Sequence, residues 1–290
     1  MIYLLLLLQQ LISSSTHLVA KNVTITLHPT TVVLIRGLFT CVAFGIYVLI
    51  RRSKVRTIDR EDIPRLLLLG LINMPINQLL FIWGVKYTTA PNASLAYALT
   101  PAFVVILLLM FRKEHPGWKR LLGVVVAFVG AAIVLVDRGA VLSSEQTLGN
   151  VMVLGASMSW AGFTVLGRPM VAKYGPVYAT ALTFFAGLAL YIPVWALIPI
   201  HDPAIALTDE TWLATWSQLF YLGVITSGVG YGLWYYALNH MDAGRVAVFN
   251  NLQPIITSVL ALIIFGTEPT PLFLVGGVIA LVGVIITQRG

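Results

Sequence analysis

Hydrophobic residues run along this chain in long stretches that end at proline, glycine or charged residues. A helix that crosses a membrane needs about 20 mostly apolar residues, and these stretches reach that length. The pattern predicts helices over residues 2–21, 29–50, 63–86, 91–111 and 119–137, and then over 149–171, 176–198, 212–239, 243–265 and 270–288. We therefore expect an all-α membrane protein of ten transmembrane helices.

The first stretch, Met1 to Ala20, shares its apolar character and its following small residues with secretory signal peptides. It lacks the basic residues with which such peptides begin. Leu18 also stands where a small residue would precede a cleavage site. We interpret this stretch as the first membrane helix.

Part of the chain is repeated. Residues 66–133 align with residues 219–286 at a constant offset of 153 residues and without a gap. The aligned pairs are Pro101 with Pro254, Gly70 with Gly223, Pro116 with Pro269, Gly123 with Gly276, Ala127 with Ala280, and Gly130 with Gly283. Unrelated apolar helices share Leu and Val by chance, but they do not readily share a register of proline and glycine.

The repeat predicts two five-helix halves, residues 1–140 and 147–290. Because five is an odd number of spans, the second half enters the membrane inverted relative to the first. Inverted repeats are typical of secondary transporters, whose substrate sites lie near the midplane of the bilayer.

Basic residues mark one set of loops. With the N-terminus inside, the inner loops and the C-terminus carry Arg51, Arg52, Lys54, Arg56, Arg60, Arg65, Arg112, Lys113, Lys119, Arg120, Arg168, Lys173, Arg245 and Arg289. The outer loops carry Lys21, Lys86 and Arg138. Because Lys and Arg concentrate in cytoplasmic loops, we expect a multi-pass protein of the cell (inner) membrane with both termini in the cytoplasm.

The composition excludes a soluble domain, since 58% of the 290 residues are hydrophobic and 10% are charged. Soluble domains average about 45–50% apolar and 25% charged residues. The net charge of +7 does not indicate nucleic-acid binding, because the basic residues lie in short loops. The single Cys41 offers neither a disulfide nor a metal-ligand pattern, so we expect no metal and no cofactor.

Two motifs repeat with the halves and resemble a known family. Leu99, Thr100 and Pro101 are followed by Glu114, and Leu252, Gln253 and Pro254 are followed by Glu268. A glycine-rich helix closes each half, and Ser159-Trp160-Ala161 with Tyr174-Gly175-Pro176 lies in the stretch that opens the second half. Over essentially its whole length the chain resembles the EamA family of the drug/metabolite transporter (DMT) superfamily.

The resemblance implies a ten-helix fold whose central cavity is lined by the first, third, fourth, sixth, eighth and ninth helices. It also implies that the fifth and tenth helices act as supports behind the cavity. Members mostly export amino acids, other small metabolites or drugs. The first helix departs from the family pattern, because Gln9-Gln10 and residues 13–16 replace the usual tryptophan step.

Polar residues inside the predicted helices mark the expected pathway, because lipid cannot satisfy them. They occur at helical spacing on the first and sixth helices, around prolines on the third, fourth and ninth, and around glycines on the eighth. We predict that the substrate is bound by Gln10, Ser14, His17, Asn73, Asn77, Tyr97, Thr100, Trp160, Thr164, Ser227, Tyr231, Trp234, Asn250 and Gln253. The alternative is that these groups only hold helices together.

Proline and glycine interrupt helices at matching depths in the two halves. Pro removes a backbone hydrogen bond and Gly loosens a helix, so either residue creates a point of bending. We predict hinges at Pro75, Pro101, Gly228, Gly230 and Pro254. The alternative is a set of fixed bends that only shape the bundle.

Arg36 is the basic residue placed well inside a predicted span. It could pair with a substrate carboxylate. We favour a structural role, in which the side chain extends toward the membrane surface or caps backbone carbonyls. All eleven acidic residues fall in loops or at helix ends, so tight proton coupling has little support.

These patterns favour a secondary transporter of a small metabolite, an amino acid or a related amphipathic solute, working as an exporter. Its partners would be that solute and the lipid bilayer, and the sequence does not indicate an oligomeric state. The first alternative is an efflux carrier for drugs, organic cations or nucleobases. A membrane-embedded enzyme of lipid metabolism is disfavoured because no Asp-rich, HExxH or Ser/His/Asp pattern is present, and a channel because no filter motif is present.

Overall fold

The computed structural model describes residues 1–50, 57–112, 117–137, 144–198, 209–265 and 271–289. Within these ranges the regular elements are all helical. The α-helices are α1 (Ile2–Thr26), α2 (Pro29–Ile50), α3 (Ile63–Leu71), α4 (Leu79–Tyr87), α5 (Ala90–Ala98), α6 (Thr100–Leu107), α7 (Trp118–Asp137), α8 (Ser144–Tyr174), α9 (Pro176–Leu197), α10 (Asp209–Phe220), α11 (Tyr231–Leu238), α12 (Ala243–Ala247), α13 (Gln253–Phe265) and α14 (Pro271–Arg289). Short elements of other helical types are η2 (Arg60–Asp62), η3 (Ile72–Gln78), η4 (Leu108–Arg112), η5 (Tyr221–Gly230) and η6 (Val248–Leu252).

Seven continuous helical stretches in the described residues are long and apolar enough to cross a membrane. They are Ile2–Thr26, Pro29–Ile50, Arg60–Tyr87, Ala90–Phe111, Glu145–Tyr174, Pro176–Leu197 and Ala243–Ile263. Helices also occupy the other ranges that the hydrophobic pattern predicts. The prediction of an all-helical membrane protein is therefore confirmed.

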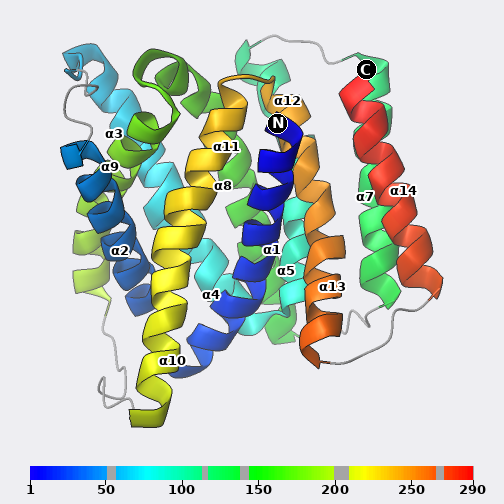
Figure 1. The fold of residues 1–290 in the computed structure, drawn as a ribbon, viewed down its shortest axis with the longest axis horizontal. Coiled ribbons are helices and arrows are strands. Elements are labelled where there is room, and N and C mark those ends of the chain that lie inside the picture. The colour runs from blue at the N-terminus through cyan, green and yellow to red at the C-terminus, as the bar shows by residue number, and fades with distance from the viewer. Residues whose placement is uncertain (51–56, 113–116, 138–143, 199–208, 266–270, 290) are drawn as a thin grey trace.

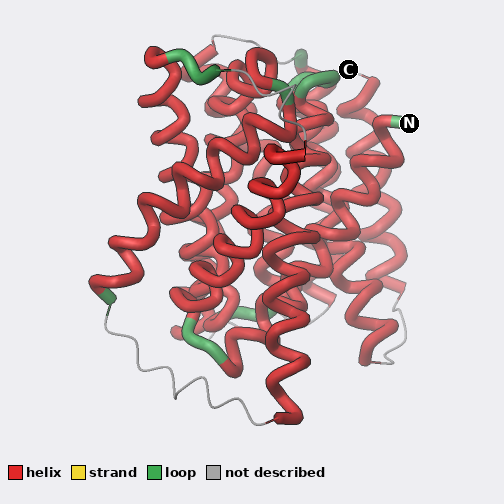
Figure 2. The backbone as a smooth tube through the Cα atoms, turned by 60° about the vertical axis from the view of Figure 1, so that its left-hand side comes forward, coloured by secondary structure: helices red, strands yellow, loops and turns green. Residues whose placement is uncertain are grey.

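The helices stand side by side in one bundle, and the two termini lie at the same end of it (Figures 1 and 2). Many large apolar residues face the outside of the bundle, while the interior holds buried polar residues beside an apolar core. On α1, Leu4, Leu8 and Leu11 are exposed, whereas Gln9 and Gln10 are buried. Such a distribution is stable only where the surroundings of the bundle are themselves apolar.

Two elements of the bundle, η3 and η5, are π-helical and lie at corresponding positions. Adding the repeat offset of 153 to residues 72–78 gives 225–231, which overlaps η5. Pro75 lies inside η3, where it cannot donate a backbone hydrogen bond, and Gly223, Gly228 and Gly230 lie in η5. π-Helical segments are rare and are frequently found at functional sites.

A second matched interruption precedes Pro101 and Pro254. Between α5 and α6 the helix breaks at Leu99, and the 3₁₀ element η6 precedes α13. Each new helix begins one residue before its proline, in the first turn, where proline is tolerated because its missing N–H would have no helical partner.

Helices α7 and α14 pack along a seam of small residues at one side of the bundle (Figure 1). A Cβ atom on Gly130 would lie 2.2 Å from the backbone nitrogen of Ala280, and one on Gly283 would lie 2.2 Å from that of Ala127. Adding 153 to 127 and 130 gives 280 and 283, so these contacts are equivalent under the repeat. Residue 127 contacts residue 283 and residue 130 contacts residue 280, so residue numbers increase along α7 where they decrease along α14. The two helices therefore run antiparallel.

Charged side chains form ion pairs at the end of the bundle that holds the termini. Lys173 pairs with Asp59 at 2.5 Å and with Asp62, which also accepts a hydrogen bond from the Tyr174 hydroxyl at 2.7 Å. Asp242 pairs there with Arg168 at 3.3 Å and with Arg120 at 3.6 Å. Three of the basic residues predicted for the inner loops, Arg120, Arg168 and Lys173, thus lie at this end.

The seam predicts that Gly130→Ala destabilises the protein by about 1–3 kcal/mol, because the added methyl group meets backbone that cannot move aside easily. The matched control is Gly45→Ala on α2, where a Cβ atom has nothing within 4 Å. Melting in detergent, followed by gel filtration, measures both changes. If the two variants melt at the same temperature, the seam is not closely packed.

Candidate functional site

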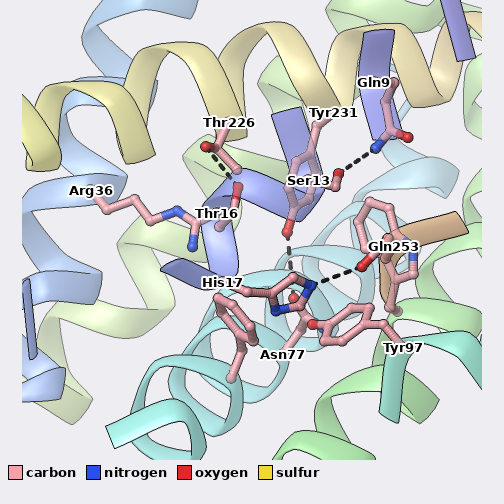
Figure 3. Close-up of a pocket in the computed structure, with 12 residues that line it drawn as sticks. Gln9, Ser13, Thr16, His17, Arg36, Asn77, Tyr97, Thr226, Tyr231 and Gln253 are labelled. Carbon is pink, nitrogen blue, oxygen red and sulfur yellow. Dashed lines mark hydrogen bonds between the residues drawn. The ribbon is translucent and has the colours of Figure 1, made fainter. Parts of the chain in front are cut away.

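A cavity lies in the middle of the bundle and has a volume of about 50 Å³. Small-molecule sites have volumes of about 300–1,000 Å³, so the cavity in this conformation is narrower than a metabolite-sized site. The lining residues are Gln9, Ser13, Thr16, His17, Arg36, Asn77, Phe81, Tyr97, Trp160, Thr226, Tyr231 and Gln253 (Figure 3). They come from elements of both predicted halves, and we call this space the central cavity.

Helix α1 turns one polar face toward the central cavity. Gln9, Ser13, Thr16 and His17 line it, and the Gln9 amide donates to the Ser13 hydroxyl at 2.8 Å. Ser14, which we predicted to face the cavity, does not line it: its carbonyl oxygen accepts a hydrogen bond from Thr257 of α13 at 3.4 Å. The predicted face is therefore rotated by about one residue.

The side chain of Asn77 joins three elements around the central cavity. Its amide nitrogen donates to the Tyr97 hydroxyl at 3.2 Å and to the Ala156 carbonyl at 2.6 Å. Its amide oxygen accepts from the Tyr231 hydroxyl at 3.4 Å. Asn77 belongs to η3, so the π-helical segment places this group where α5, α8 and α11 meet.

A chain of amide groups connects α1 with α13 beside the central cavity. His17 Nε2 lies 2.9 Å from Gln253 Oε1, and Asn250 Oδ1 accepts from Gln253 at 3.0 Å and from Gln10 at 3.3 Å. In a 3₁₀ segment residues three apart share one face, which explains why Asn250 and Gln253 point the same way. Gln253 lines the cavity. Asn250 and Gln10 do not line it, and Asn250 accepts a hydrogen bond from each of the two glutamines.

Aromatic rings form two walls of the central cavity. Trp160 stands edge-on to Tyr231, with 4.7 Å between ring centroids. Phe81 makes similar contacts with His17 at 5.3 Å and with Tyr97 at 5.7 Å. Such rings offer apolar faces to a bound solute, so the cavity combines apolar walls with polar groups.

Arg36 lines the central cavity and is 2% exposed. Its Nε atom donates to the Ser227 hydroxyl at 2.7 Å, and Figure 3 shows the side chain reaching toward Thr16. The burial of Arg36 contradicts the extension of its side chain to the membrane surface. Ser227, one of the predicted binding residues, accepts the hydrogen bond from Arg36.

The structure places the predicted binding residues in two layers. Six line the central cavity: His17, Asn77, Tyr97, Trp160, Tyr231 and Gln253. The others are fully buried but do not line it: Gln10, Ser14, Asn73, Thr100, Thr164, Ser227, Trp234 and Asn250. In this second layer the Trp234 indole donates to Thr164 at 3.1 Å, and the Thr100 hydroxyl lies 2.9 Å from that of Ser157.

The prediction missed Gln9, Thr16 and Phe81, and it did not select Ser13 or Thr226. Thr226 bonds Thr16 at 3.0 Å across the gap between η5 and α1. The polar side chains were visible in the sequence, but their direction depends on helix rotation. Phe81 gave no sequence signal, because an apolar ring in an apolar helix is ordinary.

The bundle defines the class, a helical membrane protein, and its central cavity is lined by polar and aromatic residues. The chain belongs to the EamA-like transporter family, whose model matches residues 1–136 and 147–289. This confirms the resemblance to the drug/metabolite transporter superfamily. The protein is therefore a transporter rather than an enzyme.

Similar curated proteins carry transporter names. An uncharacterized transporter of Archaeoglobus fulgidus is 32% identical over 70% of this chain and 68% of its own length. A probable terminal-alkyne amino-acid exporter of Streptantibioticus cattleyicolor is 29% identical over 83% of this chain and 76% of its own. A biotin transporter of Salmonella typhimurium is 25% identical over 81% and 77%.

The fold also has a counterpart among solved structures. One crystal structure superposes with a TM-score of 0.78 and covers 99% of this chain and 97% of the other. The sequences are 16% identical, so the likeness concerns the fold alone.

The contacts of Asn77 predict that Asn77→Ala destabilises the protein by about 1–3 kcal/mol, because the Ala156 carbonyl and two tyrosine hydroxyls lose a buried partner. The matched control is Asn22→Ala, whose amide bonds Gln218 on the exposed surface. Melting in detergent compares the variants. A wild-type melting temperature for Asn77→Ala would contradict its role as the centre of this network.

Proposed function

We propose that the protein is a secondary carrier that moves a small amphipathic metabolite of the amino-acid class across the cell membrane, working as an exporter. The observation that carries the proposal is the central cavity, a polar and aromatic space enclosed in a bundle whose outer surface is apolar. Because the cavity has a volume of about 50 Å³, its helical walls move apart when such a solute binds. The six lining residues that were predicted bind the solute directly, and the second layer fixes their positions.

The carrier comprises ten transmembrane helices in two inverted halves, residues 1–140 and 147–290. The family model supports this division because it matches the chain twice. The paired π-helical elements η3 and η5, and the antiparallel α7 and α14 with their equivalent glycine contacts, support the inversion. Rocking of one half against the other exposes the cavity to each side in turn.

The hinges of this motion are Pro75, Pro101, Gly228, Gly230 and Pro254. Each lies in or next to a helix interruption, where the hydrogen-bond ladder is already altered. A bend at such a point breaks fewer bonds than a bend inside a regular helix. The matched positions let the two halves bend at the same depth.

The lining supports an amphipathic solute. Trp160 and Phe81 give it apolar walls, while Asn77 and Gln253 offer amide groups that both donate and accept. Two of the relatives are named for an amino acid and for biotin, which combine polar and apolar parts. An organic cation is a poorer fit, because the buried guanidinium of Arg36 would repel it.

Counterflow in proteoliposomes tests the function. With unlabelled amino acid inside, uptake of the same labelled amino acid should be saturable and faster than into empty vesicles, for at least one of the twenty amino acids. Trp160→Ala should lower that uptake at least about tenfold by removing a cavity wall, a loss of about 1.4 kcal/mol. Trp212→Ala is the control, since that ring is exposed at 49%. Flux that rises linearly with concentration would instead indicate a pore.

Labelling tests the orientation, in which both termini lie in the cytoplasm. In a Cys41→Ser background, Asn22→Cys should react with a membrane-impermeant maleimide in intact cells. His240→Cys, which is also exposed but lies at the end with the termini, should react only after the cells are opened. The reverse pattern would place the termini outside.

A further inference from the structure

We propose that Arg36 binds a carboxylate group of the transported solute. The inference rests on the proposed function and adds the chemical class of the substrate. It starts from the position of the guanidinium, which lines the central cavity while the residue as a whole is 2% exposed.

The guanidinium of Arg36 has hydrogen-bond donors that the described protein atoms do not use. Its Nε atom donates to the Ser227 hydroxyl at 2.7 Å, but its buried Nη1 atom has no hydrogen-bond partner among the residues that the structure describes. An arginine presents five N–H donors in one plane, an arrangement that matches the two oxygens of a carboxylate. The unused donors are therefore suited to an acid that enters the cavity.

The charge of Arg36 also has no carboxylate beside it among the described residues. Within the part of the chain that the structure describes, neither Asp nor Glu lines the central cavity. Asp62 is buried but lies at the end of the bundle, where Lys173 and the Tyr174 hydroxyl already hold it. A buried charge without a partner is costly, so an anionic solute would stabilise this arrangement more than a neutral one.

The backbone around Arg36 fixes the position of this charge. Thr40, one turn further along α2, donates to the carbonyl oxygen of Gly223 in η5 at 2.8 Å. A Cβ atom on Gly223 would lie 2.8 Å from the Arg36 carbonyl oxygen, so glycine allows α2 and η5 to approach. Ser227 then anchors the guanidinium from the same element. A donor held in place before binding loses little freedom when the solute arrives.

The remaining lining suits the other end of such a solute. In Figure 3 Arg36 lies on one side of the central cavity, and Gln9 and Gln253 lie on the other. Trp160 and Phe81 contribute apolar surface to the same space. A carboxylate at Arg36 would leave the rest of the solute against these rings and amides.

Binding by pairs of probes tests the proposal. Each pair differs only in the acid group: L-leucine and L-leucinamide, L-phenylalanine and L-phenylalaninamide, and 3-phenylpropanoate and 3-phenylpropanamide. Ligands that bind the folded state raise its melting temperature. For at least one pair, the carboxylate should stabilise the purified wild-type protein at a concentration at least about tenfold lower than its amide.

Three variants assign this preference to Arg36. Arg36→Gln should bring the carboxylate and the amide within about twofold of each other, and Arg36→Lys should keep part of the difference because it keeps the charge. Arg65→Gln, an exposed arginine at the end of the bundle, should behave as the wild type. Since the amide probes do not need the guanidinium, their binding to Arg36→Gln also shows that this variant is folded.

The outcomes separate this proposal from the proposed function. Equal binding of acids and amides by the wild type, or an undiminished preference in Arg36→Gln, overturns the role of Arg36 even where counterflow occurs. If Arg36→Gln does not fold, the test rests on two measurements. The wild type must prefer the carboxylate to the amide, and Arg36→Lys must show a smaller preference. A preference lost in Arg36→Gln without counterflow of any probe supports the carboxylate site and contradicts the carrier. Absence of both binding and counterflow contradicts both proposals.

Discussion

Lipid provides no hydrogen bonds, and this constraint governs the arrangement of the described helices. Every polar side chain that a membrane helix carries must find a partner inside the bundle or face an enclosed polar space. On α1, Leu4, Leu8 and Leu11 point outward, while Gln10 joins Asn250 and Thr16 joins Thr226. Polar contacts therefore act together with the apolar core in deciding which face of α1 points inward.

The same constraint explains why the central cavity has two layers of polar residues. A side chain that lines the cavity can bind a solute only if its own position is fixed. Asn77 is fixed by two tyrosines and a backbone carbonyl, and Gln253 is fixed by Asn250. The second layer is as fully buried as the first, and its bonds run mainly between elements distant in sequence. Loss of a second-layer residue should therefore alter the site without removing a contact to the solute.

The sequence predicted the position of the helices well, because the length of an apolar stretch is a local property. The range 29–50 coincides with α2, and the structure interrupts the helices just before Pro101 and Pro254, two of the positions predicted as hinges. The sequence predicted the residues that line the central cavity less well. A rotation of α1 by one residue is enough to bring Gln9 to the cavity in place of Gln10. That rotation depends on contacts between distant elements, such as the bond from Thr257 to Ser14. Arg36 shows the same limit: its long side chain can reach the surface or the interior, and the partner that decides, Ser227, is 191 residues away.

The π-helical element η3 and the 3₁₀ element η6 also carry buried side-chain amides that have no hydrogen-bond partner within the described part of the chain. The amides of Asn73 and Gln78 in η3, and that of Asn251 in η6, have no partner among the described protein atoms. A buried polar group without a partner costs about 1–3 kcal/mol, and that cost raises the free energy of the arrangement in which it occurs. A carrier needs at least two arrangements of similar free energy, so that binding can shift the balance between them. The unpaired amides lie near the proposed hinges and not in the seam of α7 and α14. They would therefore reduce the difference in free energy between two arrangements of the hinges, while the supporting helices α7 and α14 stay rigid.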